Sequence, residues 1–198
     1  KCTQIVYTPG LPNPVAALPQ DNNGVLIKLP AIGEGGATSA TGTLTFGIGT
    51  QANNQPTGLK GYPVRLPGLY SAVFPPHSTH PINSFIDSGS NHIVLPKLEA
   101  LPLCDDTQAF VCPQEPKDFV AKTIGSGGTP SGDVAFKVAN GAKLLNSDNM
   151  VFSSLAARGA AGLNNVIDWG LPFFFGRTVA IGFEGRKSPL GDGLYWGY

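Results

Sequence analysis

The residues best suited to chemistry lie in segment 84–91, which reads Ser-Phe-Ile-Asp-Ser-Gly-Ser-Asn. Here an acid, Asp87, ends an apolar stretch that is typical of a β-strand. A carboxylate in or near a protein core is costly unless it is hydrogen-bonded. Gly89 lets the backbone turn sharply, and the hydroxyls of Ser88 and Ser90 can donate to the carboxylate or across an interface. The segment therefore predicts a carboxylate that its own loop holds in place.

This constellation resembles the Asp-Thr/Ser-Gly loop of aspartic proteases. Their chemistry uses two carboxylates that share a proton, so the apparent pKa values belong to the pair. One carboxylate acts as a base on a water molecule, and the other, protonated, polarises the scissile carbonyl. Asp-Ser-Gly is also a common turn sequence, so an ordinary turn is the alternative interpretation.

A second segment, 169–177, reads Trp-Gly-Leu-Pro-Phe-Phe-Phe-Gly-Arg. It resembles the part of a pepsin-like lobe in which a glycine packs behind the catalytic loop, and Gly170 matches that glycine. The spacing between Asp87 and Gly170 is similar to that in the C-terminal lobe of pepsin-type enzymes. We expect the phenylalanines at 173–175 to be core residues.

The resemblance covers nearly the whole chain, from residue 22 to residue 198. It is to the C-terminal lobe of an uncharacterised bacterial family of exported, pepsin-like proteins, and it implies a single all-β lobe over 22–198. Such a lobe is a double-psi β-barrel or sandwich with short helices. Residues 1–21 are expected to be an extended arm or linker. The matching segments are 22–30, 42–51, 85–91, 169–177 and 194–198.

The resemblance also implies roles for single residues. Asp87 matches the catalytic aspartate, and Ser88 matches the residue whose hydroxyl ties two catalytic loops together. Gly89 gives the tight turn, Ser90 bonds the outer oxygen of the aspartate, and Gly170 packs behind the loop. Two features depart from the family pattern: the flap hairpin has no counterpart, and a serine at 88 replaces the commoner threonine.

The implied function is that of one lobe of a bilobal aspartic endopeptidase acting on polypeptides without a cofactor. The partner would be an N-terminal lobe, on a separate chain or an upstream segment, held through Cys2 or by packing. A second copy of the chain, in a homodimer, is another source of the second aspartate. The alternative functions are an inactive pepsin-fold binding or inhibitor module at the cell surface, and an unrelated β-sandwich adhesin.

Composition supports an all-β chain and excludes some partners. The 198 residues carry 13 Lys+Arg and 13 Asp+Glu, so the formal net charge is +0, which argues against a nucleic-acid binder. There are 26 glycines and 18 prolines, and only 13% of residues are charged, which disfavours helical bundles. No apolar run approaches the ~20 residues of a membrane span.

Cys104 and Cys112 bracket a short loop between two prolines. A local disulfide is the prediction, and two separate buried thiols are the alternative; a Cys-x-x-Cys redox or zinc pair needs closer spacing. A disulfide implies an oxidising compartment, so we expect a secreted, periplasmic or cell-surface protein. Cys2 is then left without a partner, and the chain opens without Met, so we expect that it is cut from a longer protein.

The expected elements are mostly short strands separated by turns. Segments 25–29 and 41–48 are expected to pair as a hairpin, Pro63 indicates an edge strand, and Asn140-Gly141 is expected to be a hairpin turn. Residues 152–161 are rich in helix formers and are expected to form a short helix. The other expected strands are 62–66, 70–74, 82–86, 92–95, 119–123, 133–138, 166–169 and 178–183.

The sequence offers no strong signal for a metal site, a phosphate-binding loop or a serine hydrolase. His77, His80 and His92 lie on loops and are interpreted as surface residues, so we expect no metal site. The glycine-rich segment 125–128 lacks the Lys-Ser/Thr of a phosphate-binding loop. The sequence also contains no nucleophile elbow of the serine-hydrolase type.

Overall fold

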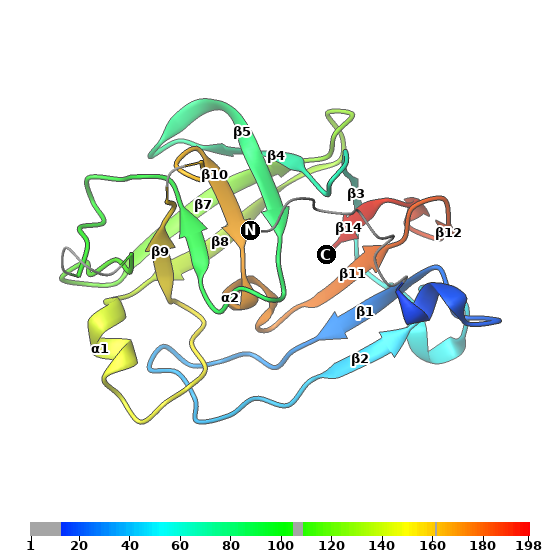
Figure 1. Ribbon diagram of the computed structural model, residues 1–198, viewed down its shortest axis with the longest axis horizontal. Coiled ribbons are helices and arrows are strands. Elements are labelled where there is room, and N and C mark those ends of the chain that lie inside the picture. Colours follow the sequence, from blue (N-terminus) through cyan, green and yellow to red (C-terminus); the bar gives the residue numbers. More distant parts are fainter. Residues whose placement is uncertain (1–12, 105–108, 161) are drawn as a thin grey trace, which may run out of the picture.

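The computed structural model describes residues 13–104, 109–160 and 162–198 (Figure 1). These residues form a mainly β structure with curled sheets, which confirms the expected all-β fold. The strands are β1(Gly24–Lys28), β2(Thr43–Phe46), β3(Gly61–Pro63), β4(Tyr70–Phe74), β5(Ser78–Ile86), β6(Ile93–Leu95), β7(Lys117–Ile124), β8(Ser131–Val138), β9(Ala156–Arg158), β10(Val166–Trp169), β11(Thr178–Gly182), β12(Lys187–Ser188), β13(Gly191–Asp192) and β14(Tyr195–Gly197). The helices are the 3-10 helices η1(Pro14–Ala17) and η2(Ala52–Asn54) and the α-helices α1(Gly141–Leu145) and α2(Leu171–Phe174).

The strands form two larger sheets and one small one. A seven-stranded sheet has the order β8-β7-β4-β5-β10-β6-β9, and a five-stranded sheet has the order β2-β1-β11-β14-β3. Strands β12 and β13 pair with each other. The expected β1–β2 hairpin is confirmed, with Val25 opposite Phe46. Strand β3, which contains Pro63, lies at a sheet edge as the proline indicated.

Strands β5 and β10 run parallel in the centre of the seven-stranded sheet (Figure 1). Trp169 at the end of β10 lies opposite Ile86 at the end of β5. Because the two strands are parallel and end side by side, the segments that follow them leave the sheet at the same end. These segments are residues 87–92 and the helix α2, which are far apart in sequence. This register brings the two chemically distinctive segments of the sequence together.

Burial explains why β5 and β10 form strands at the centre of a sheet. Along β5 burial alternates, with Ile82, Ser84 and Ile86 pointing into the protein, whereas the last three residues of β10 are all buried. The four apolar residues Ile82, Ile86, Ile167 and Trp169 belong to the largest buried cluster, which takes residues from both large sheets. Phe173 and Phe174 of α2 are also in this cluster, which confirms that they are core residues. Phe175, which was also expected in the core, is only partly buried.

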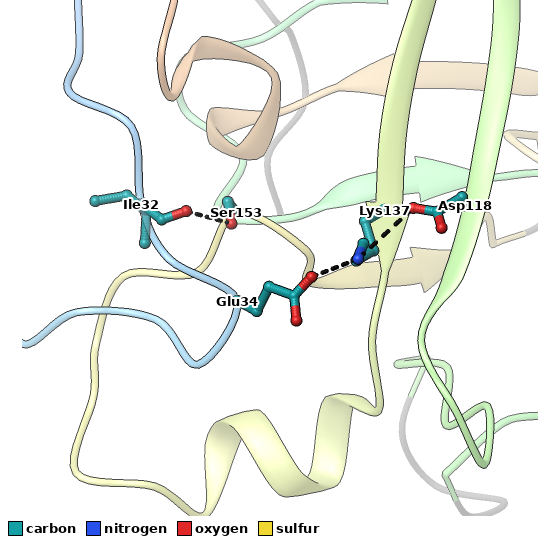
Figure 2. Close-up of polar contacts among 5 residues, drawn as sticks. All are labelled: Ile32, Glu34, Asp118, Lys137 and Ser153. Carbon is teal, nitrogen blue, oxygen red and sulfur yellow. Dashed lines mark hydrogen bonds and ion pairs between the residues drawn. The ribbon is translucent and has the colours of Figure 1, made fainter.

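The long connection between β1 and β2 is held against the other sheet (Figure 2). The hydroxyl of Ser153 donates to the carbonyl of Ile32 at 3.2 Å. Glu34 forms an ion pair with Lys137 of β8, and Lys137 also lies 3.8 Å from a carboxylate oxygen of Asp118 on β7. The contacts at Lys137 are exposed, so they contribute little to stability.

Two expectations about local structure were wrong. The predicted helix over 152–161 is instead strand β9, because Ala156, Ala157 and Arg158 pair in parallel with β6; this pairing overrides local helix propensity. The predicted hairpin turn at Asn140-Gly141 is instead the start of α1. The Oδ1 atom of Asn140 accepts the N–H of Lys143 at 3.0 Å, as expected of an asparagine N-cap.

Part of the expected arm over 1–21 lies within the described residues. Residues 14–17 form η1, and the side chain of Asn13 caps this helix by accepting the N–H of Val15 at 3.0 Å. Val15 is buried. The rest of that prediction, on residues 1–12, lies outside the described residues.

Candidate functional site

Asp87 is the first residue after β5, and it is half-buried. Its backbone N–H donates to the carbonyl of Trp169 at 3.0 Å, which extends the β5–β10 ladder by one bond. The acid therefore begins its loop from the rigid centre of a sheet. A side chain in this place has little freedom to reorient.

The loop itself holds both oxygens of the Asp87 carboxylate. The N–H of Gly89 donates to Oδ1 at 2.7 Å, and the hydroxyl of Ser90 donates to Oδ2 at 3.0 Å. The N–H of Ser90 also donates to the carbonyl of Asp87 at 3.3 Å, which closes the turn. The expected contact between Ser90 and the carboxylate is thus present. These two donors hold the carboxylate in one orientation.

Ser88 and Gly89 form the exposed tip of the loop. Within the described residues, the Ser88 hydroxyl has no hydrogen bond, so it is open to solvent or to a partner. A Cβ atom at position 89 would lie 3.0 Å from Oδ1 of Asp87, which is tighter than normal contact. Glycine is therefore the residue that fits this turn best.

Gly170 lies directly behind the loop. A Cβ atom there would lie 2.1 Å from the carbonyl oxygen of His92 and 2.6 Å from that of Ser90. The next residue, Leu171, donates its N–H to the carbonyl of Ser90 at 2.7 Å. The loop after β5 and the start of α2 are thus packed backbone to backbone, and only glycine leaves room for this contact.

A second carboxylate, which the sequence reasoning missed, belongs to the same cluster. Asp168 on β10 is only 4% exposed, and its Oδ2 lies 3.1 Å from the hydroxyl oxygen of Ser90. Its Oδ1 is buried and has no hydrogen-bond partner among the described residues. Burial raises the pKa of Asp168 to about 6, the negative charge of Asp87 adds to this rise, and the Ser90 hydroxyl opposes it.

The missed residue had a visible signal. The segment 166–169 reads Val-Ile-Asp-Trp, so an acid interrupts an apolar strand, just as Asp87 ends one. Segment 166–169 is predicted from its sequence only as a strand, so Asp168 is not among the expected site residues.

A cavity of about 440 Å³ opens beside the loop. Most of its lining comes from residues 145–155, between the end of α1 and the start of β9, and the rest from residues 91–92, from Phe110 and from Leu171 and Phe175 at the two ends of α2. The lining is mainly apolar and includes Asn91, His92, Phe110, Leu155, Leu171 and Phe175. The exposed side chain of Met150 lies at its rim. A cavity of this size and character suits an apolar side chain of a ligand.

The predicted disulfide between Cys104 and Cys112 is confirmed. It closes a loop whose ends also pair through the backbone, because the N–H of Cys104 donates to the carbonyl of Phe110 at 3.0 Å. Phe110 in turn lines the cavity. The disulfide therefore supports one wall of the cavity. The prediction about Cys2 lies outside the described residues.

The histidines are separate from one another. His77 Nε2 lies 2.8 Å from Oδ1 of Asn165, and His80 is exposed. His92 packs its ring against Phe110 with centroids 5.3 Å apart, and burial lowers its pKa. No three potential metal-binding side chains come together in the part of the chain that the structure describes.

The sequence comparisons give the family. The chain belongs to the family described as "Protein of unknown function (DUF3443)", which it matches over residues 1–198. A search of curated proteins found no match. Among the described helices, none is long and apolar enough to cross a membrane.

Proposed function

We propose that this chain is one pepsin-like lobe of a bilobal aspartic endopeptidase and supplies one of the two catalytic aspartates, Asp87. The observation that carries the proposal is that hydrogen bonds hold the Asp87 carboxylate in one position. Both of its oxygens are held by donors from its own loop, and the loop is packed against Gly170, which lies between β10 and α2. A preorganised carboxylate at a surface is what general-base catalysis on water requires.

In the proposed reaction, ionised Asp87 takes a proton from a water molecule while the water oxygen bonds to the carbonyl carbon of a peptide. The protonated aspartate of the partner lobe donates to the carbonyl oxygen, which gives a tetrahedral intermediate. The C–N bond then breaks as the leaving amine takes the proton from Asp87, and one hydroxyl of the intermediate returns its proton to the partner aspartate, which leaves a carboxylic acid and an amine. Each carboxylate oxygen accepts about two hydrogen bonds, so the bonds from Gly89 and Ser90 leave room for the water.

The cavity beside the loop supports a polypeptide substrate with an apolar side chain near the cleaved bond. It adjoins Ser90 through Asn91 and His92 and adjoins Gly170 through Leu171. Asp87 itself does not line the cavity, so in the proposed complex the peptide backbone runs from the cavity to the Asp87 loop. Holding the scissile bond in position in this way would lower the barrier to hydrolysis.

The partner and the compartment are part of the proposal. The second aspartate comes from an N-terminal lobe, and the exposed tip of the loop at Ser88 is a suitable place to meet the matching loop of that lobe. The disulfide between Cys104 and Cys112 favours an oxidising compartment, so we place the protein in the periplasm, at the cell surface or outside the cell.

The second candidate is an inactive pepsin-fold binding or inhibitor module. The apolar cavity favours it, because a binding function needs that cavity and does not need Asp87. The bonds from Gly89 and Ser90 would then make Asp87 a structural acid of the turn. Fold alone does not decide between the two candidates.

A cleavage assay separates the candidates. The protein is isolated without reductant from the cells that make it, so that any associated chain stays bound, and intact mass is measured. A denatured protein is then offered from acid to neutral pH. The proposal predicts acid-dependent cleavage that a pepstatin-type inhibitor blocks. If no cleavage occurs at any pH while peptides with apolar side chains still bind, the binding module is the correct function.

A further inference from the structure

One hydroxyl group lies between two carboxylates. Ser90 Oγ is 3.0 Å from Oδ2 of Asp87 and 3.1 Å from Oδ2 of Asp168. Both distances are normal for O–H···O hydrogen bonds. The two acids come from different strands, β5 and β10, and the register of those strands brings them to the same hydroxyl.

The number of hydrogen atoms available for these two hydrogen bonds determines how many of the three side chains can be ionised. A serine hydroxyl has one hydrogen and can accept two hydrogen bonds, whereas an ionised carboxylate can only accept. With both acids ionised, the hydroxyl would satisfy one carboxylate, and its oxygen would face the other without a hydrogen between them. Two satisfied bonds therefore require a proton on one of the two carboxyl groups.

The surroundings indicate which acid carries that proton. Asp87 is half-buried, and its other oxygen accepts a backbone N–H. Asp168 is 4% exposed, and its other oxygen has no partner among the described residues. A buried carboxyl without donors favours the neutral form.

We propose that Asp168 is a positioning residue for Asp87, holding a proton that it donates to Ser90 Oγ while the Ser90 hydroxyl donates its own hydrogen to Oδ2 of Asp87. The chain of bonds fixes the direction of the Ser90 hydroxyl and keeps a donor on the catalytic carboxylate. The catalytic consequence rests on the proposed function. The proton arrangement itself does not, because it follows from the three side chains alone.

The groups around Asp168 support this arrangement. Opposite Asp168, β5 carries Phe85 and β6 carries Val94, and neither titrates. The described charged group that acts on Asp168 is Asp87, whose negative charge raises the pKa of Asp168. The nearby His92 has its pKa lowered by burial, so it adds no positive charge near neutral pH. The titration of Asp168 therefore depends on Asp87 and Ser90.

Carboxyl NMR of the chain with ¹³C-labelled aspartate tests the inference directly. The Asp168 signal is assigned through its backbone amide, so the assignment needs no variant, and its midpoint is expected at about 6. Ser90→Ala should lower that midpoint, since it removes the oxygen that accepts the Asp168 proton and so stabilises the neutral form. Asp87→Asn should lower it, since it removes a neighbouring negative charge. Ser90→Thr keeps the hydroxyl and should restore the wild-type value.

The matched control is Asp133→Asn. Asp133 is an exposed acid on β8, paired with Lys122, and its loss should leave the Asp168 midpoint unchanged. An Asp168 midpoint near the ordinary value of 3.8, or one that neither Ser90→Ala nor Asp87→Asn moves, would overturn the inference.

Activity adds an independent test of the catalytic consequence. If the protein cleaves peptides, loss of the Asp168 proton should contribute a fall of about tenfold in kcat for each pH unit above the midpoint. In Asp168→Asn the amide is a donor that does not titrate, so this component of the pH profile should vanish. A profile identical to wild type contradicts the positioning role. Absence of any cleavage, with the NMR result as expected, refutes the proposed function and leaves the proton arrangement standing.

Discussion

Replacing Asp168 by asparagine should remove a pH-dependent loss of stability. In the folded protein, burial raises the pKa of this acid from 3.8 to about 6, so the folded state binds its proton more tightly than the unfolded state does. Stability from this group is then fully present below about pH 4 and falls as pH rises to about 6. Above that pH, Asp168 is ionised in both the folded and the unfolded protein, and its contribution to stability is fully lost. The asparagine side chain has no such proton to lose.

The size of the effect follows from the shift. At about 1.36 kcal/mol for each unit of pKa, ionising Asp168 in the folded protein costs about 3 kcal/mol, as an upper value. This is a large fraction of the total stability of a typical domain, which is about 5–15 kcal/mol. The effect is therefore well above the error of a denaturation experiment.

Urea unfolding of wild type and Asp168→Asn at several values from about pH 3 to about pH 8 measures this effect. The difference in free energy of unfolding between the two proteins should change by about 3 kcal/mol in favour of the variant as pH rises. For the control Asp133→Asn, which removes an exposed ion pair, the difference in free energy of unfolding from wild type should change by less than about 1 kcal/mol over the same pH range. Parallel pH curves for wild type and Asp168→Asn would refute the reasoning.

Two further predictions concern the packing behind the loop and the cavity. Gly170→Ala should lower the free energy of unfolding by about 3 kcal/mol, because the new Cβ would lie 2.1 Å from a carbonyl oxygen; Gly127→Ala, where the Cβ meets nothing within 4 Å, should be neutral in the same urea experiment. Met150→Lys at the cavity rim should raise KM several-fold for peptides with apolar side chains, measured by steady-state kinetics. Leu66→Lys, equally exposed but outside the cavity, should leave KM unchanged, and equal KM values for both variants would mean that the cavity does not bind substrate.

The loop that carries Asp87 could be predicted from sequence because its determinants are local. Asp87, Gly89 and Ser90 are close in the chain, and the hydrogen bonds among them follow from a tight turn. The disulfide between Cys104 and Cys112 was predictable for the same reason, because only a short stretch of chain separates the two cysteines. The β1–β2 hairpin was predictable although its connection is long, because strands that follow each other in the chain commonly pair.

The features that could not be predicted depend on distant pairing. Strand β9 forms where local propensity favours a helix, because Ala156 and Ala157 pair with β6. Asp168 lies at the Ser90 hydroxyl only because β10 runs parallel to β5 in one particular register. The cavity likewise combines segments from several parts of the chain. A pattern of residue types along one segment carries no information about such contacts.

The central claim is that the Asp87 carboxylate is the base that activates water for peptide hydrolysis. The most direct measurement is kcat for peptide cleavage at acid pH by wild type, Asp87→Asn and the control Asp133→Asn, each isolated with its associated chain and shown to be folded. The account predicts a fall of at least about 10² to 10⁴ in kcat for Asp87→Asn and none for the control. Full activity in folded Asp87→Asn would contradict it.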